Sequence, residues 1–96
     1  MQRQKSIFTR EYKILLATLA RLREESGMTQ GDVGKAMNRT QSVVSKSEVA
    51  SRRMDVIEVR QYCLGIGVGF VRFAEIYEAE LASGAETARK SKTRTY

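Results

Sequence analysis

The sequence contains no histidine, and this absence removes several classes of chemistry at once. Without imidazole there is no His-containing zinc site and no serine hydrolase triad. The single cysteine, Cys63, cannot form an internal disulfide, which fits a reducing compartment. Its apolar neighbours predict a buried core thiol, with a reactive or intermolecular thiol as the alternative. No acid, base and nucleophile recur at catalytic spacing, so we expect no enzyme, no metal and no cofactor.

Long hydrophobic runs are also missing. No stretch approaches the ~18 apolar residues that span a bilayer, and the opening residues MQRQKSIF lack the apolar segment of a secretory signal. We therefore expect a cytoplasmic protein with no membrane partner. The chain of 96 residues, with a hydrophobic share of 42%, suffices for one globular domain.

Positive charge is concentrated in three segments of the chain. Residues 1–13, 39–53 and 84–96 each carry four Lys or Arg and one acidic residue, a net charge of 4 − 1 = +3. Residues 68–83 carry one basic and three acidic residues, a net charge of 1 − 3 = −2. This distribution favours a polyanion as partner, with the acidic segment facing elsewhere. The basic ends alone are equally consistent with solvated tails.

Residues 29–53 predict two short helices joined by a tight turn. Thr29 and Thr40 are each followed by glutamine, and a threonine before a helix accepts a hydrogen bond from a backbone amide of the first turn. Asn38, between the two helices, tolerates the left-handed conformation of a turn. Gly34 is expected where another helix crosses closely. The two helices are predicted at residues 30–37 and 41–49.

Apolar residues at helical steps predict three further helices. These helices are expected at residues 9–26, 55–65 and 69–82, within a domain of residues 9–82 that lies between a flexible basic arm (1–8) and a disordered basic tail (83–96). The fourth helix is interpreted as core, with an apolar stripe of Val56, Val59, Cys63 and Ile66 widened by Ile57, Tyr62 and Leu64. The fifth has apolar residues on more than one face, which predicts a dimer seam; closure of the monomer core is the alternative. The predicted seam consists of Phe70, Phe73, Tyr77 and Leu81.

Residues 9–82 resemble the lambda-repressor-like, or XRE-type, helix-turn-helix family of bacterial and phage regulators. The resemblance is carried by LRxxxGMTQxDVGxAMxxTQSxVSKxE, here Leu22 to Glu48. It implies an all-α, five-helix lambda-repressor-like fold in which helices 2 and 3 form the helix-turn-helix. In that family the third helix enters the DNA major groove and the second lies across the backbone.

The resemblance also implies roles for individual residues. Gln41 becomes the first base reader, because its amide can donate to N7 and accept from N6 of adenine. Arg23 on the first helix is expected to pair with Glu48 at the end of the third, which fixes the orientation of the reading helix. The remaining base contacts fall on Ser42, Ser45 and Lys46, and the phosphate contacts on Gln30, Arg39, Thr40, Arg52 and Arg53.

Two positions depart from the family pattern in a way that bears on the third helix. Ser47 stands where relatives usually place an apolar or aromatic residue, which predicts a thinner core beneath this helix. Ala50 stands where a glycine commonly closes the helix, which predicts that it ends differently or continues further.

Together these features predict a sequence-specific double-stranded DNA-binding transcriptional regulator. It is expected to act as a repressor and as a homodimer on a palindromic operator, with half-sites about one helical turn apart. The alternative is an antitoxin that binds a toxin protein and autoregulates its operon. The basic tail has few apolar residues with which to anchor a toxin.

Overall fold

The computed structural model describes residues 9–83, which form five helices and no strand. The predicted all-α, five-helix fold is therefore confirmed. The predictions for residues 1–8 and 84–96 lie outside the described residues, and the last helix includes Ser83, one residue beyond the predicted domain. The helices are α1 (Arg10–Glu25), α2 (Gln30–Met37), α3 (Gln41–Glu48), α4 (Val56–Gly65) and α5 (Phe70–Ser83).

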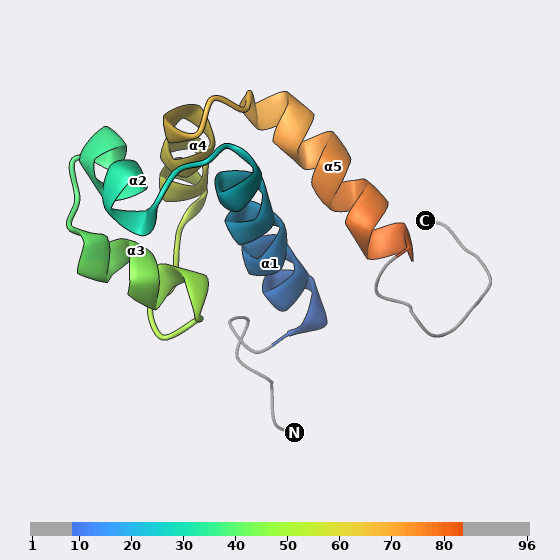
Figure 1. Cartoon of the computed structure of the whole chain (residues 1–96). Helices are drawn as coiled ribbons and strands as arrows, with labels where there is room; N and C mark the ends of the chain where they lie inside the picture. The colour runs from blue at the N-terminus through green and yellow to red at the C-terminus, as the bar shows by residue number, and fades with distance from the viewer. Residues whose placement is uncertain (1–8, 84–96) are drawn as a thin grey trace, which may run out of the picture.

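The helix-turn-helix lies at one end of the molecule. Figure 1 shows α2 and α3 on one side of α1 and α4, and α5 on the other side. α5 runs antiparallel to α1: the Tyr77 hydroxyl donates to the Glu11 carbonyl at 2.8 Å, and Arg10 donates to the Leu81 carbonyl at 3.0 Å. No helix within residues 9–83 is both long and apolar enough to cross a membrane.

Side-chain caps fix where the helices begin. The hydroxyls of Thr9, Thr29 and Thr40 accept from backbone amides at 3.2, 3.0 and 3.2 Å, as the sequence predicted for the last two. At α4, Asp55 and Glu58 form a reciprocal capping box. The sequence therefore encodes the start of each of the first four helices locally.

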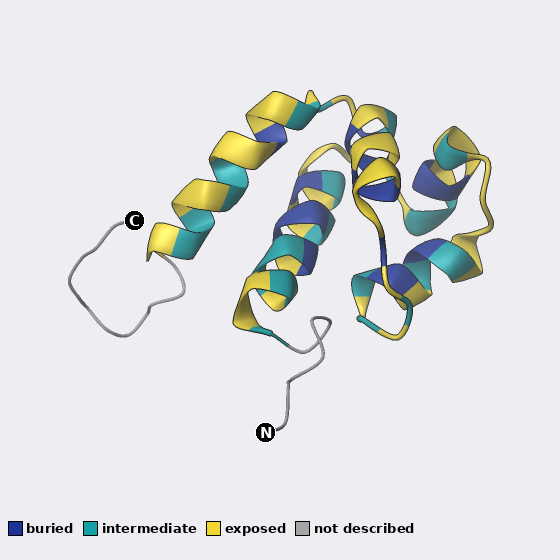
Figure 2. Ribbon diagram, turned by 180° about the vertical axis from the view of Figure 1, so that it is seen from behind, coloured by how far each residue is buried: buried dark blue, intermediate teal, exposed yellow. Residues whose placement is uncertain are grey.

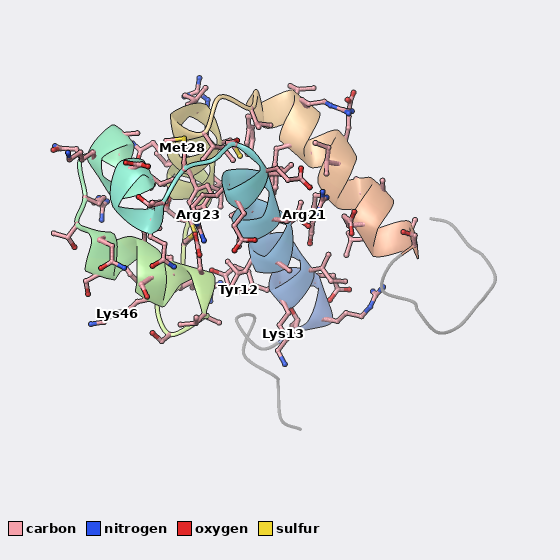
Figure 3. The ribbon with its side chains drawn as sticks, viewed as in Figure 1. Tyr12, Lys13, Arg21, Arg23, Met28 and Lys46 are labelled. Atoms are coloured by element: carbon pink, nitrogen blue, oxygen red, sulfur yellow. The ribbon has the colours of Figure 1, made fainter. Side chains whose placement is uncertain are left out.

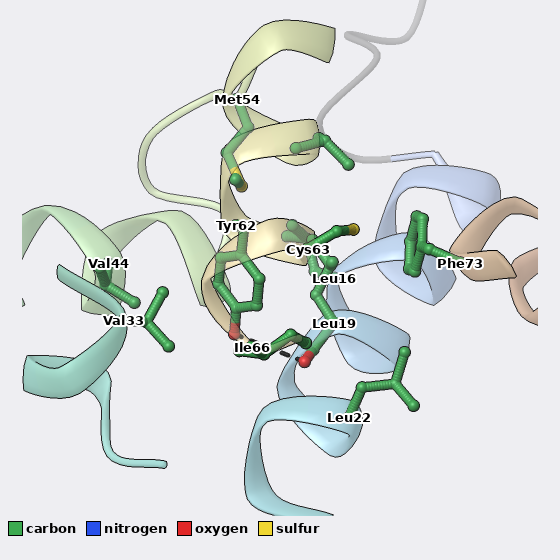
Figure 4. Packing of buried hydrophobic residues seen from close by; sticks show 11 residues of the cluster. Leu16, Leu19, Leu22, Val33, Val44, Met54, Tyr62, Cys63, Ile66 and Phe73 are labelled. Atoms are coloured by element: carbon green, nitrogen blue, oxygen red, sulfur yellow. Dashed lines mark hydrogen bonds between the residues drawn. The ribbon is translucent and has the colours of Figure 1, made fainter. Parts of the chain in front are cut away.

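One core joins all five helices (Figure 4). Tyr62 and Cys63 on α4 are 1% and 0% exposed, and Leu19 on α1 is 0% exposed. Burial raises the pKa of the Cys63 thiol to about 11, which agrees with a core thiol rather than a reactive one. The remaining core side chains are Leu16, Leu22, Val33, Val44, Met54, Val59, Ile66 and Phe73.

The predicted apolar stripe of α4 is only partly correct. Val59, Cys63 and Ile66 are buried, together with Tyr62. The other three side chains were wrongly assigned to the core, because the outer side of α4 has no neighbouring helix within the described residues (Figure 2). Val56, Ile57 and Leu64 are 62%, 59% and 52% exposed.

The dimer-seam prediction is wrong for Phe73. Its side chain is 2% exposed and its ring stacks on Tyr77 with centroids 6.1 Å apart, so it closes the core of its own domain. Phe70, Tyr77 and Leu81 are half-buried, and most of the remaining surface of α5 is exposed (Figure 2). For these three residues the seam stays a prediction.

The close approach at Gly34 involves a turn and not a second helix. A Cβ atom at Gly34 would lie 2.8 Å from the carbonyl oxygen of Arg39. The tight crossing of two helices occurs instead at Gly65 on α4, where a Cβ would lie 3.1 Å from the Cβ of Ala36 on α2. Gly34 therefore makes room for the backbone that leads into α3.

Candidate nucleic-acid interface

α3 turns an apolar side inward and a polar side outward. Val44 and Ser47 are each 2% exposed and face the core. Ser45 is half-buried, and Figure 3 shows Lys46 directed away from the body of the protein. Gln41 and Ser42 are exposed. Three of the four predicted base-reading residues are therefore exposed, and Ser45, on the same side of α3, is half-buried.

The ion pair expected between Arg23 and Glu48 is formed. Arg23 Nε donates to Glu48 Oε2 at 2.8 Å, and a terminal guanidinium nitrogen donates to Oε1 at 3.1 Å. The other terminal nitrogen donates to the Met28 carbonyl at 2.9 Å. Figure 3 shows Arg23 between α1 and the helix-turn-helix. This planar contact fixes the end of α3 on α1 and on the segment that leads into α2.

A second donor to Glu48 comes from α4. The Tyr62 hydroxyl donates to Glu48 Oε2, and it also lies 3.4 Å from the Leu19 carbonyl (Figure 4). Burial and the neighbouring carboxylate both raise the pKa of Tyr62, so the hydroxyl keeps its proton. Burial alone would raise the pKa of Glu48, but the hydrogen bonds from Arg23, Tyr62 and Gln30 outweigh it and hold that pKa below its usual range. Glu48 is therefore ionised at neutral pH.

Gln30 connects this carboxylate to the first residue of α3. Its side-chain nitrogen donates to Glu48 Oε1 at 2.9 Å, and its side-chain oxygen accepts from Gln41 Nε2 at 2.7 Å. Both ends of the Gln30 amide are therefore engaged within the protein. The resemblance implies a phosphate contact for Gln30, and no local sequence pattern indicates its link to Gln41.

Two predictions about the end of α3 are corrected by the geometry. Ala50 has a φ of 64°, so it adopts the left-handed conformation that a glycine would take, and α3 stops at Glu48 without continuing. Ser47 does not leave its buried position unfilled: its hydroxyl donates to the Val43 carbonyl at 2.8 Å and accepts from Arg52 at 3.3 Å. Polar contacts therefore occupy the position where relatives usually have an apolar or aromatic side chain.

Glu58, which forms the capping box of α4 with Asp55, also binds two arginines. Its Oε2 atom lies 2.6 Å from Arg52 and 3.2 Å from Arg39, although the residue is only 8% exposed. The hydrogen bond from Arg52 lowers the pKa of Glu58 despite its burial. Arg39 and Arg52, both predicted to contact phosphates, thus have part of their positive charge offset by the Glu58 carboxylate. Thr40 and Arg53, also predicted to contact phosphates, are exposed.

Within residues 9–83 no group of three or more Asp, Glu or Cys side chains is arranged to hold a metal ion. The exposed polar groups on α3 and its flanks are amides, hydroxyls and cations, and Val49 at the end of the helix is an exposed apolar side chain. Such polar groups recognise base edges and phosphates by hydrogen bonding and charge.

Comparisons with known proteins agree with the helix-turn-helix fold. A family model described as a helix-turn-helix domain matches residues 14–76. An XRE-family like protein from Pseudomonas syringae pv. tomato str. DC3000 is 39% identical, with a TM-score of 0.71 over 77% of this chain and 90% of that one. No curated protein sequence gives a significant match.

A second similar structure is that of a controller protein bound to DNA. The restriction-modification controller protein C.Esp1396I, solved as a tetramer in complex with its natural 35 base-pair operator, is 25% identical. The match has a TM-score of 0.71 and covers 76% of this chain and 96% of that one. Together with the match to the helix-turn-helix model, these likenesses show that this chain belongs to the XRE-type helix-turn-helix family and is a DNA-binding regulator.

Proposed function

We propose that this protein is a transcriptional repressor that binds a palindromic operator as a homodimer. The observation that carries the proposal is the uncovered polar side of α3, held in place by a capped turn and by the contacts of Glu48. A helix presented in this way fits the major groove with its amino end towards the bases. Occlusion of a promoter is then sufficient for repression.

In this proposal base reading is divided among four side chains. Gln41 reads adenine through its amide, and Lys46 reaches guanine O6 and N7. Ser42 and Ser45 each supply one adaptable hydrogen bond. Backbone contacts position the protein without reading sequence, and they are proposed for Gln30, Arg39, Thr40, Arg52 and Arg53.

The homodimer is supported by apolar surface on α4 and α5. An apolar cleft of about 330 Å³ opens between α1, α4 and α5, with Val56 and Tyr77 among its lining residues. Val71 on α5 is 74% exposed. In the proposed dimer a second copy covers this surface, and each copy presents its own α3 to one half-site. The seam is proposed to include Phe70, Tyr77 and Leu81.

Light scattering tests the placement of the seam. Tyr77→Glu puts a charge into this surface, so we expect a monomer at concentrations where the unaltered chain is a dimer. Tyr77→Phe is the matched control: it loses the hydrogen bond to the Glu11 carbonyl but keeps the ring, and should remain a dimer. A Tyr77→Glu variant that stays dimeric excludes this seam.

Selection from a pool of random duplexes tests the function itself. We expect enrichment of one palindrome, lost in Gln41→Ala. Arg53→Ala removes an exposed cation, so binding should weaken to the same extent on every sequence. The slope of the logarithm of affinity against the logarithm of salt concentration should become shallower by about one. Equal binding to all sequences contradicts the proposal. Within residues 9–83 nothing favours the antitoxin alternative, which copurification with a small partner protein would support.

A further inference from the structure

Hydrogen bonds connect the exposed end of α3 to the buried core in one continuous chain. Gln41 donates to Gln30 at 2.7 Å, Gln30 donates to Glu48 at 2.9 Å, and the Tyr62 hydroxyl donates to the same carboxylate from α4. Tyr62 is 1% exposed, whereas Gln41 is exposed. The chain therefore crosses the domain from α4 to the surface that faces DNA in the proposed complex.

The direction of these bonds is determined by Glu48. An ionised carboxylate only accepts hydrogen bonds, whereas each glutamine amide has a donor end and an acceptor end. Gln30 must therefore turn its nitrogen to Glu48, which leaves its oxygen for Gln41. Gln41 must in turn direct its nitrogen to Gln30. One charge thus sets the orientation of two amides that would otherwise be free to flip.

This orientation determines which hydrogen-bond donors and acceptors Gln41 can present to a base. One hydrogen of Nε2 is used by Gln30, so the outward edge of the amide carries one donor and one acceptor, Oε1. Adenine presents the complementary pair in the major groove, the N7 acceptor and the N6 donor. Guanine presents two acceptors, N7 and O6, and cannot satisfy Oε1.

We propose that Glu48 is a specificity-determining residue that acts through Gln30, committing Gln41 to adenine and against guanine. This inference rests on the proposed function, because it requires that Gln41 reads a base. Glu48 is a positioning residue: it touches no DNA and determines only which way the two amides face. Its ion pair with Arg23 is a separate, structural contact.

The test compares affinities for operators that carry adenine or guanine at the base pair read by Gln41. For the unaltered chain we expect about tenfold tighter binding to adenine, within the range of a good bidentate contact. Glu48→Gln has an amide that can donate or accept, so both orientations of the chain become possible and the preference should fall to about threefold or less. Gln30→Met breaks the link without touching Glu48 and should lower the preference similarly.

Tyr62→Phe is the matched control. It removes a donor from the same carboxylate and lowers the melting temperature, but it leaves the direction of the chain intact. The preference for adenine should therefore be unchanged. A loss of preference in Tyr62→Phe would mean that the preference follows stability, and the proposal would be wrong.

The outcomes distinguish a failure of base reading by Gln41 from a failure of the role proposed for Glu48. If Gln41→Ala changes no base preference, base reading by Gln41 is wrong and the proposed function loses its main reader. If Gln41→Ala removes the preference while Gln30→Met keeps all of it, only the role of Glu48 is refuted. An unaltered chain that prefers guanine at this base pair also overturns the proposal. Even if Glu48→Gln fails to fold, a preference kept in full by Gln30→Met refutes the proposal.

Discussion

Glu48 is the residue on which the orientation of α3 depends. Its carboxylate accepts hydrogen bonds from Arg23 on α1, Gln30 on α2 and Tyr62 on α4. Taking a carboxylate and a guanidinium out of water costs free energy that their attraction only roughly offsets. The complete pair therefore contributes little net stability, but removing one of its members leaves the other charge without its main partner.

Glu48→Ala should destabilise the fold by about 3 kcal/mol, because it removes the main partner of a largely buried guanidinium, which keeps the Met28 carbonyl and a longer contact with Glu24 at 3.7 Å. The side chains of the pair are only 11% and 7% exposed. Denaturant unfolding measures the change. Glu75→Ala is the control: it breaks an ion pair with Arg72 in which both side chains are more than 60% exposed, and should change stability by less than about 0.5 kcal/mol. Equal effects of the two substitutions would contradict the structural role of Glu48.

Ala50→Gly should stabilise the protein by about 1 kcal/mol, since a left-handed conformation at φ 64° costs an alanine about that much and costs a glycine almost nothing. Thermal unfolding checks the sign of the change. Ala17→Gly on the exposed side of α1 is the opposite case, and should destabilise by about 1 kcal/mol. If both substitutions destabilise, the left-handed conformation at Ala50 carries no strain.

The sequence predicted the pairing of Arg23 with Glu48 but not the binding of Arg39 and Arg52 by Glu58. The first pair belongs to a motif with fixed spacing, so a resemblance is enough to find it. The second depends on three segments meeting: the turn before α3, the loop after it and the first turn of α4. No local pattern encodes that meeting, because the three segments come together only in the folded domain.

At the scale of the element, the helix boundaries were predictable and the buried faces were predictable only in part. Caps such as Thr40 and turn residues such as Asn38 act within a few residues, so the chain specifies them locally. Burial requires a neighbour that covers the side chain. Leu64 is as apolar as Cys63 but is 52% exposed, because no helix of residues 9–83 lies on that side of α4.

The two glycines of α2 should respond to alanine in opposite ways. Gly34→Ala should destabilise the fold by at least about 2 kcal/mol, because the new Cβ would meet the Arg39 carbonyl oxygen at 2.8 Å and the turn backbone cannot move aside cheaply. Gly31→Ala meets only the Thr29 hydroxyl, at 3.7 Å, and should stabilise α2 by up to about 1 kcal/mol. Thermal unfolding of both variants gives the comparison. A neutral Gly34→Ala would mean that the turn into α3 yields easily.

At the scale of the whole molecule, the described helices are held together by carboxylates as well as by apolar contacts. Glu48 joins α3 to α1, α2 and α4, and Glu58 joins α4 to the segments on either side of α3. Both carboxyls have pKa values below their usual range. The arrangement of the proposed DNA-binding face is therefore linked to the ionisation of two acidic side chains.

This linkage predicts that the protein loses stability in acid. Above the unfolded pKa of about 4.3 both states carry ionised glutamates, and the full stabilisation is present. As the pH falls, the unfolded chain binds protons first, so the free energy of unfolding decreases until the folded pKa values are passed. Each carboxyl contributes at most about 1.4 kcal/mol per pH unit in that window. Urea unfolding from pH 7 to pH 3 measures the decrease, and Glu48→Gln should show a shallower one. Stability that is constant or rises between pH 5 and pH 3 would contradict the lowered pKa values of both residues.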